Sequence, residues 1–247
     1  MSTSSSGKFR TYIKYFWLLF FTPFLILGLI LLFASKGWIG EEPPSFYELE
    51  NPKSALASEI ISDDQQVLGK YYIQNRTNVH YYELSPNLVN ALKATEDIRF
   101  ENHSGVDIRG LLRVIFRAGT AGGGSTITQQ LAKNLFHERP DSKLERVIQK
   151  LQEWIIAVQL ERRYTKEEIL AMYLNTVEFS SNAFGIKSAA RTYFNKTPDA
   201  LNIQEAAVLI GMLQAPTKYN PVRNPKNSLT RRNVVLGQMK KYDLLTP

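Results

Sequence analysis

The stretch from Gly122 to Asn134 combines residue types that suit a ligand-binding turn and helix. Three consecutive glycines, Gly122 to Gly124, let the backbone adopt positive φ angles and approach a ligand closely. Ser125 or Thr126 can then cap the following helix by accepting hydrogen bonds from its first N–H groups. Such N–H groups, together with the positive end of the helix dipole, attract anions, and phosphate is a common one. The stretch therefore predicts an anion-binding helix start.

The helix after this turn is predicted to have one chemical face and one packing face. A 3.6-residue repeat places the polar residues Thr126, Gln130 and Lys133 in one stripe. The apolar residues Ile127, Leu131 and Leu135 lie on the other side of the helix. A glycine-rich loop before a solvated amphipathic helix would give the same pattern, and this stretch alone leaves that alternative equally open. The glycines are not followed by Gly-Lys-Ser/Thr, so the turn is not a nucleotide P-loop.

Two adjacent acids lie where another predicted helix gives way to a loop. Glu96 and Asp97 end a helix that Ser85 begins, and Phe100 and His103 follow closely. Negative charge is unfavourable at the C-terminal end of a helix dipole, which makes ordinary surface acids the poorer explanation. Carboxylates at the edge of a cleft can instead act as general acids or bases.

A cation and a third acid lie on a long helix that Ser142 is predicted to cap and that continues to about Arg163. Lys150 and Glu153 are three residues apart, the spacing of a surface ion pair worth about 0.2–0.5 kcal/mol. The buried face of this helix is expected to contain Leu144, Val147, Ile148, Leu151, Trp154, Ile155 and Val158. Combined with Glu96 and Lys133, the pair suits transfer of a sugar from a phosphate leaving group, with a carboxylate for the hydroxyl and cations for the phosphate.

Composition narrows the classes of partner. The 247 residues are 44% hydrophobic and carry a net charge of +7, which favours an anionic partner such as a phosphorylated substrate or an anionic lipid. Lys and Arg do not alternate with aromatic residues in a stripe, so nucleic acid is not an expected partner. The chain has no cysteine, and His103 has no second ligand residue at metal-binding spacing, so no metal site is predicted.

An apolar run near the N-terminus predicts a single membrane-spanning helix. Tyr15 to Ser35 contains 21 residues without a charge, and at about 1.5 Å per residue such a run spans the hydrocarbon layer. Lys8, Arg10 and Lys14 precede it, so the positive-inside rule places residues 1–14 in the cytoplasm and the remainder outside the membrane. A cleaved signal peptide is the alternative, although the run is longer than the usual apolar segment of one and no clear cleavage site follows.

The rest of the sequence predicts a linker and then a mainly helical domain. Prolines and acids favour a linker after the membrane, and residues 59–61 and 67–73 suggest a short β-hairpin, which together assign 36–84 to a linker and hairpin region. From residue 85 to 247 the pattern is helical. Beyond the helices already named, we expect Asp107 to cap a helix over 111–116, Thr165 to open another, and further helices over 184–194, 203–213 and 230–242.

Four ordered motifs resemble glycosyltransferase family 51, the peptidoglycan glycosyltransferase domain found in the N-terminal part of bifunctional class A penicillin-binding proteins. These motifs are Glu96-Asp-x-x-Phe-x-x-His-x-Gly105, Gly124-Ser-Thr-Ile-Thr-Gln-Gln-Leu-Ala-Lys-Asn134, Lys150-x-x-Glu153 and Tyr164-Thr-Lys-x-Glu-Ile-Leu-x-x-Tyr-Leu-Asn175. The likeness continues through Ala183 to Ala190 and Arg231 to Leu236, so that it covers residues 85 to 242.

The resemblance implies a lysozyme-like, two-lobed, mainly α-helical domain that joins lipid II units into glycan strands and releases undecaprenyl pyrophosphate. Glu96 would be the general base for the 4-hydroxyl of the acceptor sugar, and inversion would follow from a single displacement. Glu153 would be the second catalytic residue, orienting or stabilising the donor pyrophosphate region. Substrate-binding roles would fall to Asp97, Phe100, His103, Ser125, Thr126, Gln130, Lys133, Asn134 and Lys150. The loop from Gly119 to Gly124 would be mobile and close over substrate.

The resemblance also implies partners and leaves one cofactor open. The partners would be lipid II, the nascent strand, the cytoplasmic membrane and other cell-wall synthesis proteins, and a divalent cation, Mg²⁺ or Mn²⁺, is an option at the donor pyrophosphate. The sequence departs from the family pattern at Gln149 and Ile98, where many members have Arg. Arg146, one turn before Gln149, is a candidate substitute, and affinity for pyrophosphate is the property that these departures affect.

Two other functions remain as alternatives. A glycan hydrolase on the same frame would also use two carboxylates, although it has no diphosphate to hold. A non-catalytic anchor that binds the lipid-linked precursor would not need Glu96 at all. Penicillin-type transpeptidase chemistry is not expected, because Ser5 to Lys8 in the tail is the only Ser-x-x-Lys. The sequence ends at Pro247 without a capping structure, which suggests a longer natural protein cut at a domain edge.

Overall fold

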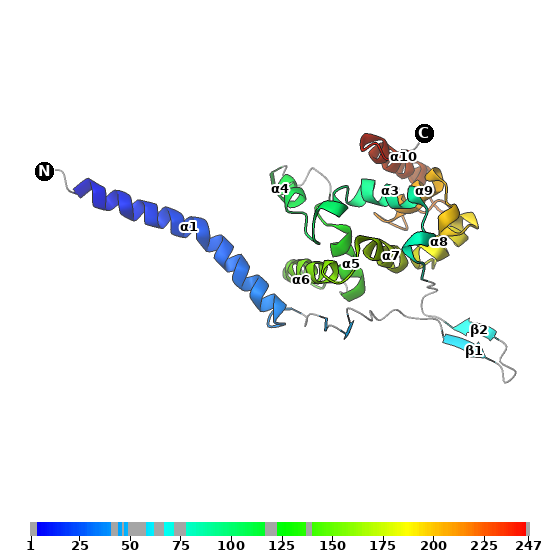
Figure 1. Ribbon diagram of the computed structural model, residues 1–247, viewed down its shortest axis with the longest axis horizontal. Coiled ribbons are helices and arrows are strands. Elements are labelled where there is room, and N and C mark those ends of the chain that lie inside the picture. Colours follow the sequence, from blue (N-terminus) through cyan, green and yellow to red (C-terminus); the bar gives the residue numbers. More distant parts are fainter. Residues whose placement is uncertain are drawn as a thin grey trace.

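The structure, a computed structural model, describes residues 4–40, 44–45, 47–48, 58–61, 67–71, 78–116, 123–136 and 140–245. It is mainly helical, with an N-terminal apolar helix ahead of a packed helical body (Figure 1). The α-helices are α1 (Ser4–Ser35), α3 (Pro86–Glu96), α4 (Ile108–Phe116), α5 (Ile127–Phe136), α6 (Lys143–Glu161), α7 (Lys166–Thr176), α8 (Gly185–Phe194), α9 (Ile203–Met212) and α10 (Pro225–Lys241).

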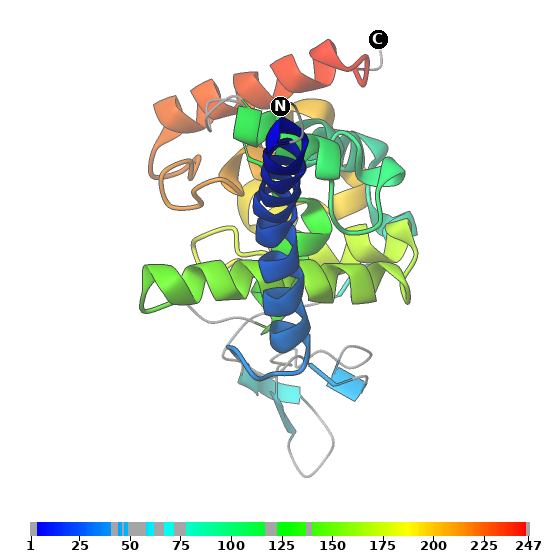
Figure 2. The same cartoon turned by 90° about the vertical axis from the view of Figure 1, so that its left-hand side faces the viewer.

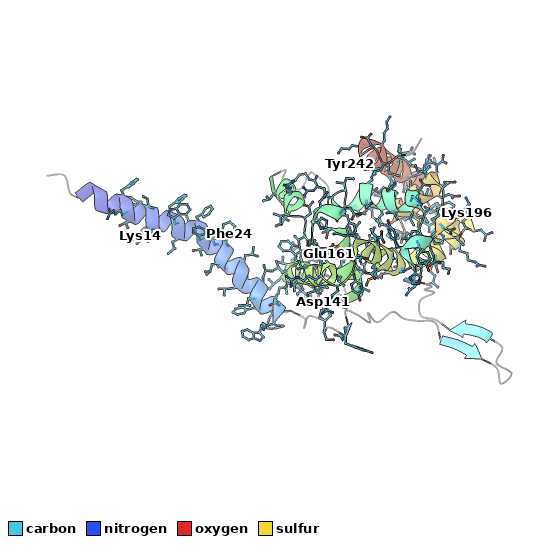
Figure 3. The ribbon with its side chains drawn as sticks, viewed as in Figure 1. Lys14, Phe24, Asp141, Glu161, Lys196 and Tyr242 are labelled. Atoms are coloured by element: carbon cyan, nitrogen blue, oxygen red, sulfur yellow. The ribbon has the colours of Figure 1, made fainter. Side chains whose placement is uncertain are left out.

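Helix α1 is long and apolar enough to cross a membrane over Phe9–Ser35, which spans 27 residues. Its large apolar side chains, among them Phe24, are exposed and project around a helix that extends away from the body (Figure 3). Exposure of this much apolar surface along a helix is expected for a helix that lies in lipid. Where α1 ends, Ala34 is fully buried and Gly40 lies against Ile148 of α6, so the exit from the helix packs on the body.

The predicted hairpin forms between β1 (Ser58–Ile61) and β2 (Val67–Tyr71), which pair antiparallel. The register runs from Ser58 opposite Tyr71 to Ile61 opposite Val67, with an irregularity at Ile60 and Ile61. The packed body begins at about residue 79, ahead of the predicted boundary at 85, because both polar groups of the Asn175 amide bond the backbone of Val79.

Capping residues set several helix starts where the sequence predicts them. Ser85 accepts from the Leu88 N–H to begin α3, and Ser142 and Thr165 form capping boxes with the glutamates three residues later. Helix α10 begins at Pro225, five residues before the predicted start, because a proline is well suited to the first helical position.

The core lies among α3, α5, α7, α9 and α10. Helix α3 contacts both α9 and α10, and α5 contacts both α6 and α7. Fully buried side chains include Leu88, Leu92, Phe100, Ile127, Leu131, Ile169, Tyr173 and Ile210. Figures 1 and 2 place α10 on one side of the body and α6 on the opposite side, with the end of α3 between them.

The expected buried face of α6 is wrong. Leu144 is 71% exposed and Val147 is 58% exposed, whereas Gln149, Gln152 and Glu153 are buried. The buried side of α6 contains these polar residues together with Ile156, Ala157 and Leu160. Helix α6 contacts α5, and part of its predicted apolar stripe receives the chain leaving α1. Periodicity identifies two faces of a helix, but it does not say which one meets the body when a charged cluster must be buried.

Candidate functional site

A cleft of about 590 Å³ opens at the C-terminal end of α3. Its walls come from residues 94–99, from α4, from residues 123–126 with α5, from residues 213–214 just after α9, and from α10. Glu96 and Asp97 line this cleft together with Ser125, Thr126 and Gln130. The prediction that the two acids lie at the edge of a cleft is therefore confirmed.

Glu96 is held in the cleft by an ordered chain of hydrogen bonds. The amide Nε2 of Gln130 donates to Glu96 Oε2 at 2.9 Å, and the hydroxyl of Tyr173 donates to Gln130 Oε1 at 2.9 Å. Because Tyr173 occupies the amide oxygen, the amide N–H₂ of Gln130 faces the carboxylate. Helix α5 thus supplies the group that orients the acid of α3, and α7 fixes that group in turn.

Tyr173 was not singled out from the sequence. Its side chain is 1% exposed, and burial, followed by the charge of Glu96, raises its pKa well above the ordinary value. The hydroxyl therefore stays protonated and acts as a donor. Tyr173 is part of the fourth motif, but in the sequence a tyrosine in an apolar helix segment is indistinguishable from an ordinary core residue.

Asp97 and His103 lie behind Glu96 and brace the start of α5. Asp97 Oδ2 accepts from the backbone N–H of Ile127 at 3.1 Å and lies 3.0 Å from His103 Nε2. The ring of Phe100 is fully buried beside His103. An anion was expected to bind the N–H groups at this helix start. At the N–H of Ile127 that anion is the carboxylate of Asp97, a group of the protein itself.

Thr126 and Gly105 also hold the start of α5 in position. The Thr126 hydroxyl donates to the Gly105 carbonyl at 2.6 Å and accepts from the Gln129 N–H at 3.1 Å, so Thr126 caps α5 as predicted. Gly105 has φ +91, and a Cβ there would lie 2.7 Å from the carbonyl carbon of Ala157 in α6. Only glycine allows the loop to approach α6 this closely.

A charge cluster built around a buried acid lies on α6 behind Ser125. Glu153, whose side chain is 1% exposed, accepts from Arg146 Nη1 at 2.6 Å and from Lys150 Nζ at 2.8 Å. Lys150 also donates to Ser125 Oγ at 2.7 Å, which links the cluster to the wall of the cleft. Burial lowers the pKa of Lys150, and the hydrogen bond with Glu153 opposes that effect.

The structure brings Glu96 and the cationic cluster to the same region but does not place Glu153 on the cleft surface. Glu153 stays behind Lys150 and Ser125, and it joins two cations rather than facing open space. The guanidinium of Arg146 reaches Glu153, and its role as a substitute for the arginine missing at Gln149 stays a prediction. Lys133 and Asn134 lie exposed near the end of α5, and the charge of Lys133 contributes to lowering the Lys150 pKa.

The residues around Glu153 do not fit a divalent cation. Both of its carboxylate oxygens accept hydrogen bonds from cations, and in the described part of the chain no group of three or more His, Asp or Glu side chains could hold a metal ion. Positive charge at this position comes from Arg146 and Lys150. The predicted mobile loop from Gly119 lies largely outside the described residues, which resume at Gly123.

Comparison with known proteins places these features in a family context. The family described as Transglycosylase matches residues 64–240. Penicillin-binding protein 1A of Pseudomonas aeruginosa is 34% identical over 228 residues, which cover 90% of this chain and 27% of that protein. Penicillin-binding protein 1A/1B of Bacillus subtilis is 42% identical over 201 residues, covering 78% of this chain and 21% of that protein.

A solved structure of penicillin-binding protein 1A from Haemophilus influenzae is also similar, at 22% identity and a TM-score of 0.38, covering 79% of this chain and 21% of that chain. The chain therefore spans less than a third of the length of each of these relatives.

Proposed function

This chain belongs to the transglycosylase family, glycosyltransferase family 51, and from that membership we propose that it is a peptidoglycan glycosyltransferase of the class A penicillin-binding protein type. It polymerises lipid II into β-1,4-linked glycan strands and releases undecaprenyl pyrophosphate. The observation that carries the proposal is a carboxylate, Glu96, oriented by Gln130 in a cleft that a cationic cluster borders through Ser125.

Glu96 acts as the general base in this reaction. Its carboxylate accepts the proton of the acceptor 4-hydroxyl as that oxygen attacks the anomeric carbon of the donor. The bond from the anomeric carbon to the diphosphate oxygen breaks in the same step, so the configuration inverts. The hydrogen bond from Gln130 leaves the other carboxylate oxygen of Glu96 available to the acceptor.

The cationic cluster stabilises the leaving diphosphate. Lys150, Arg146 and Lys133 supply positive charge near Ser125, where negative charge develops as the glycosidic bond breaks. Glu153 keeps Arg146 and Lys150 together at fixed positions, so the charge is in place before the reaction begins. Asp97 and His103 hold the start of α5, and thereby Gln130, in register with Glu96.

Helix α1 anchors the enzyme in the cytoplasmic membrane. With residues 1–14 in the cytoplasm, the helical body lies outside, where lipid-linked precursors and the growing strand are its partners. Other cell-wall synthesis proteins are further partners, and nucleic acid is not.

Incubation of the purified protein with lipid II, and separately with finished glycan strands, tests the proposal. We expect polymer to form from lipid II and the finished strands to keep their length. Shortening of the strands without consumption of lipid II would instead identify a hydrolase. Binding of lipid II without turnover would identify a non-catalytic anchor.

A further inference from the structure

A second buried acid lies where α5, α6 and α7 meet, and the proposed reaction does not use it. Glu161 is the last residue of α6, and its side chain is 4% exposed. Helix α5 contacts both α6 and α7 beside it (Figure 1). Negative charge is unfavourable at the C-terminal end of a helix dipole and costly to bury, so a carboxylate at this position requires donors.

The two neighbouring helices supply these donors. The Thr128 hydroxyl of α5 donates to Glu161 Oε1 at 2.6 Å, and Lys166 Nζ of α7 lies 2.7 Å from Glu161 Oε2. A buried ion pair is a weak source of stability, because apolar side chains of similar volume often replace it without loss. Its hydrogen bonds are directional, however, and they fix the position of α5 relative to α6 and α7.

Lys166 also connects Glu161 to the loop after α3. Its Nζ donates to the His103 carbonyl at 2.6 Å. The His103 ring contacts Asp97, and Asp97 accepts from the Ile127 N–H at the start of α5. The first turn of α5 is therefore attached at two consecutive residues, at Ile127 through its backbone and at Thr128 through its side chain.

The attachment at Thr128 lies across α5 from Gln130. Residues two positions apart are separated by about 200° around an α-helix, so the two side chains point to nearly opposite sides. Gln130 meets Glu96 in the cleft, whereas Thr128 is fully buried. Glu161 borders a separate hollow of about 470 Å³, which shares no lining residue with the cleft among the described residues. Glu161 is thus placed to act on the reaction through α5 and not by contact with substrate.

We propose that Glu161 is a positioning residue for the base Glu96, acting through Thr128 and Gln130. This inference rests on the proposed function, in which Glu96 accepts the proton of the acceptor. The bond from Thr128 fixes the rotation of α5 about its axis, and that rotation sets the direction from which the Gln130 amide meets the Glu96 carboxylate. Lys166 holds the Glu161 carboxylate in place for this contact.

Thr128→Val in the full chain tests the proposal, because valine keeps the shape of the side chain and removes the hydroxyl. We expect kcat for lipid II polymerisation to fall about 5-fold or more with KM within about twofold, since a hydrogen bond to a charged group is lost. Thr128→Ser keeps the hydroxyl and should retain about half of the wild-type kcat or more. Thr176→Val is the matched control, since the Thr176 hydroxyl donates to the Met172 carbonyl within α7, and it should match wild type.

A double-mutant cycle separates positioning from a general loss of stability. In a Gln130→Ala background, Thr128→Val should lower kcat by less than about twofold further, because no amide is left to orient. Urea denaturation gives the folded fraction of each variant, and kcat is expressed per folded molecule. Should Thr128→Val fail to fold, Glu161→Gln replaces it in the cycle. Its expected loss in kcat is about 3-fold, because a neutral amide oxygen is a weaker acceptor than a carboxylate.

Three outcomes would contradict these expectations in distinguishable ways. Equal kcat values for Thr128→Val and Thr128→Ser would overturn the positioning role of Glu161. A loss from Thr128→Val that is as large without Gln130 as with it would overturn the route through Gln130. A wild-type protein that does not polymerise lipid II in the same assay would overturn the proposed function itself, and the inference with it.

Discussion

Glu96 depends on two side chains that do not touch the substrate in the proposed reaction. Gln130 can turn either its N–H₂ or its oxygen toward a carboxylate, and the Tyr173 hydroxyl determines which, because it occupies the oxygen. With the hydroxyl removed, a fraction of the Gln130 amides would present oxygen to the Glu96 carboxylate. The position of the base therefore depends on a residue of α7.

Tyr173→Phe is expected to lower kcat about 5-fold and to leave KM within about twofold, since one hydrogen bond worth about 1 kcal/mol no longer fixes the base. Initial rates of lipid II polymerisation over a range of substrate concentrations measure both constants. Tyr193→Phe is the matched control, because its hydroxyl also donates inside the fold, to the Phe179 carbonyl, but does not contact Gln130. Equal kcat values for the two variants would contradict the positioning role.

Lys150 gives the site a pH dependence. Burial lowers its pKa from the ordinary value of 10.5, so this ammonium loses its charge at a lower pH than an exposed lysine does. As pH rises toward 10, donor KM should rise because positive charge next to the diphosphate is lost. Lys150→Arg, which stays charged throughout this range, should have a donor KM that changes less with pH. A wild-type donor KM that is constant up to pH 10 would argue against contact between Lys150 and the diphosphate.

At the scale of the elements, the position of the loop after α3 relative to α6 depends on Gly105. A side chain at this position would both strain a positive φ and collide with the backbone of Ala157. Gly105→Ala is expected to reduce the free energy of unfolding by about 1–3 kcal/mol. Gly237 lies inside α10, and no atom is within 4 Å of a Cβ added there. Gly237→Ala should therefore raise the free energy of unfolding by about 0.5–1 kcal/mol. Urea denaturation of both variants measures the difference, and equal stabilities would contradict the close approach.

The sequence predicted helix starts better than helix faces. Ser85, Ser142 and Thr165 are local signals, since a capping side chain acts on N–H groups within three residues. The buried face of α6 could not be predicted, because it depends on where Arg146, Lys150 and Glu153 meet α5 and on the chain leaving α1. Phe100 was assigned to substrate from the resemblance, yet its ring is fully buried and does not line the cleft, whereas Thr126 lines the cleft and also caps α5. A sequence motif locates a site, but it does not distinguish the residues that line the cleft from those that support its wall.

At the scale of the whole molecule, the proposed topology requires the tail and the helical body to lie on opposite sides of the membrane. The chain has no cysteine, so a single introduced thiol reports its own location. In intact cells, a membrane-impermeant maleimide should label Lys226→Cys, which replaces an exposed residue of α10, but should label Ser6→Cys only after lysis. The opposite pattern would reverse the orientation, and labelling of both would exclude an intact barrier between them.

Polymerisation of lipid II by Glu96→Gln is the most direct measurement of the central claim. Glutamine retains the shape of the side chain but cannot accept the proton of the acceptor hydroxyl, so the initial rate should fall by about 10²–10⁴-fold. The matched control is Glu101→Gln, which removes an acid from the same loop that pairs with Lys93 and does not line the cleft; it should polymerise at the wild-type rate. A Glu96→Gln protein that forms glycan as fast as wild type would contradict the account.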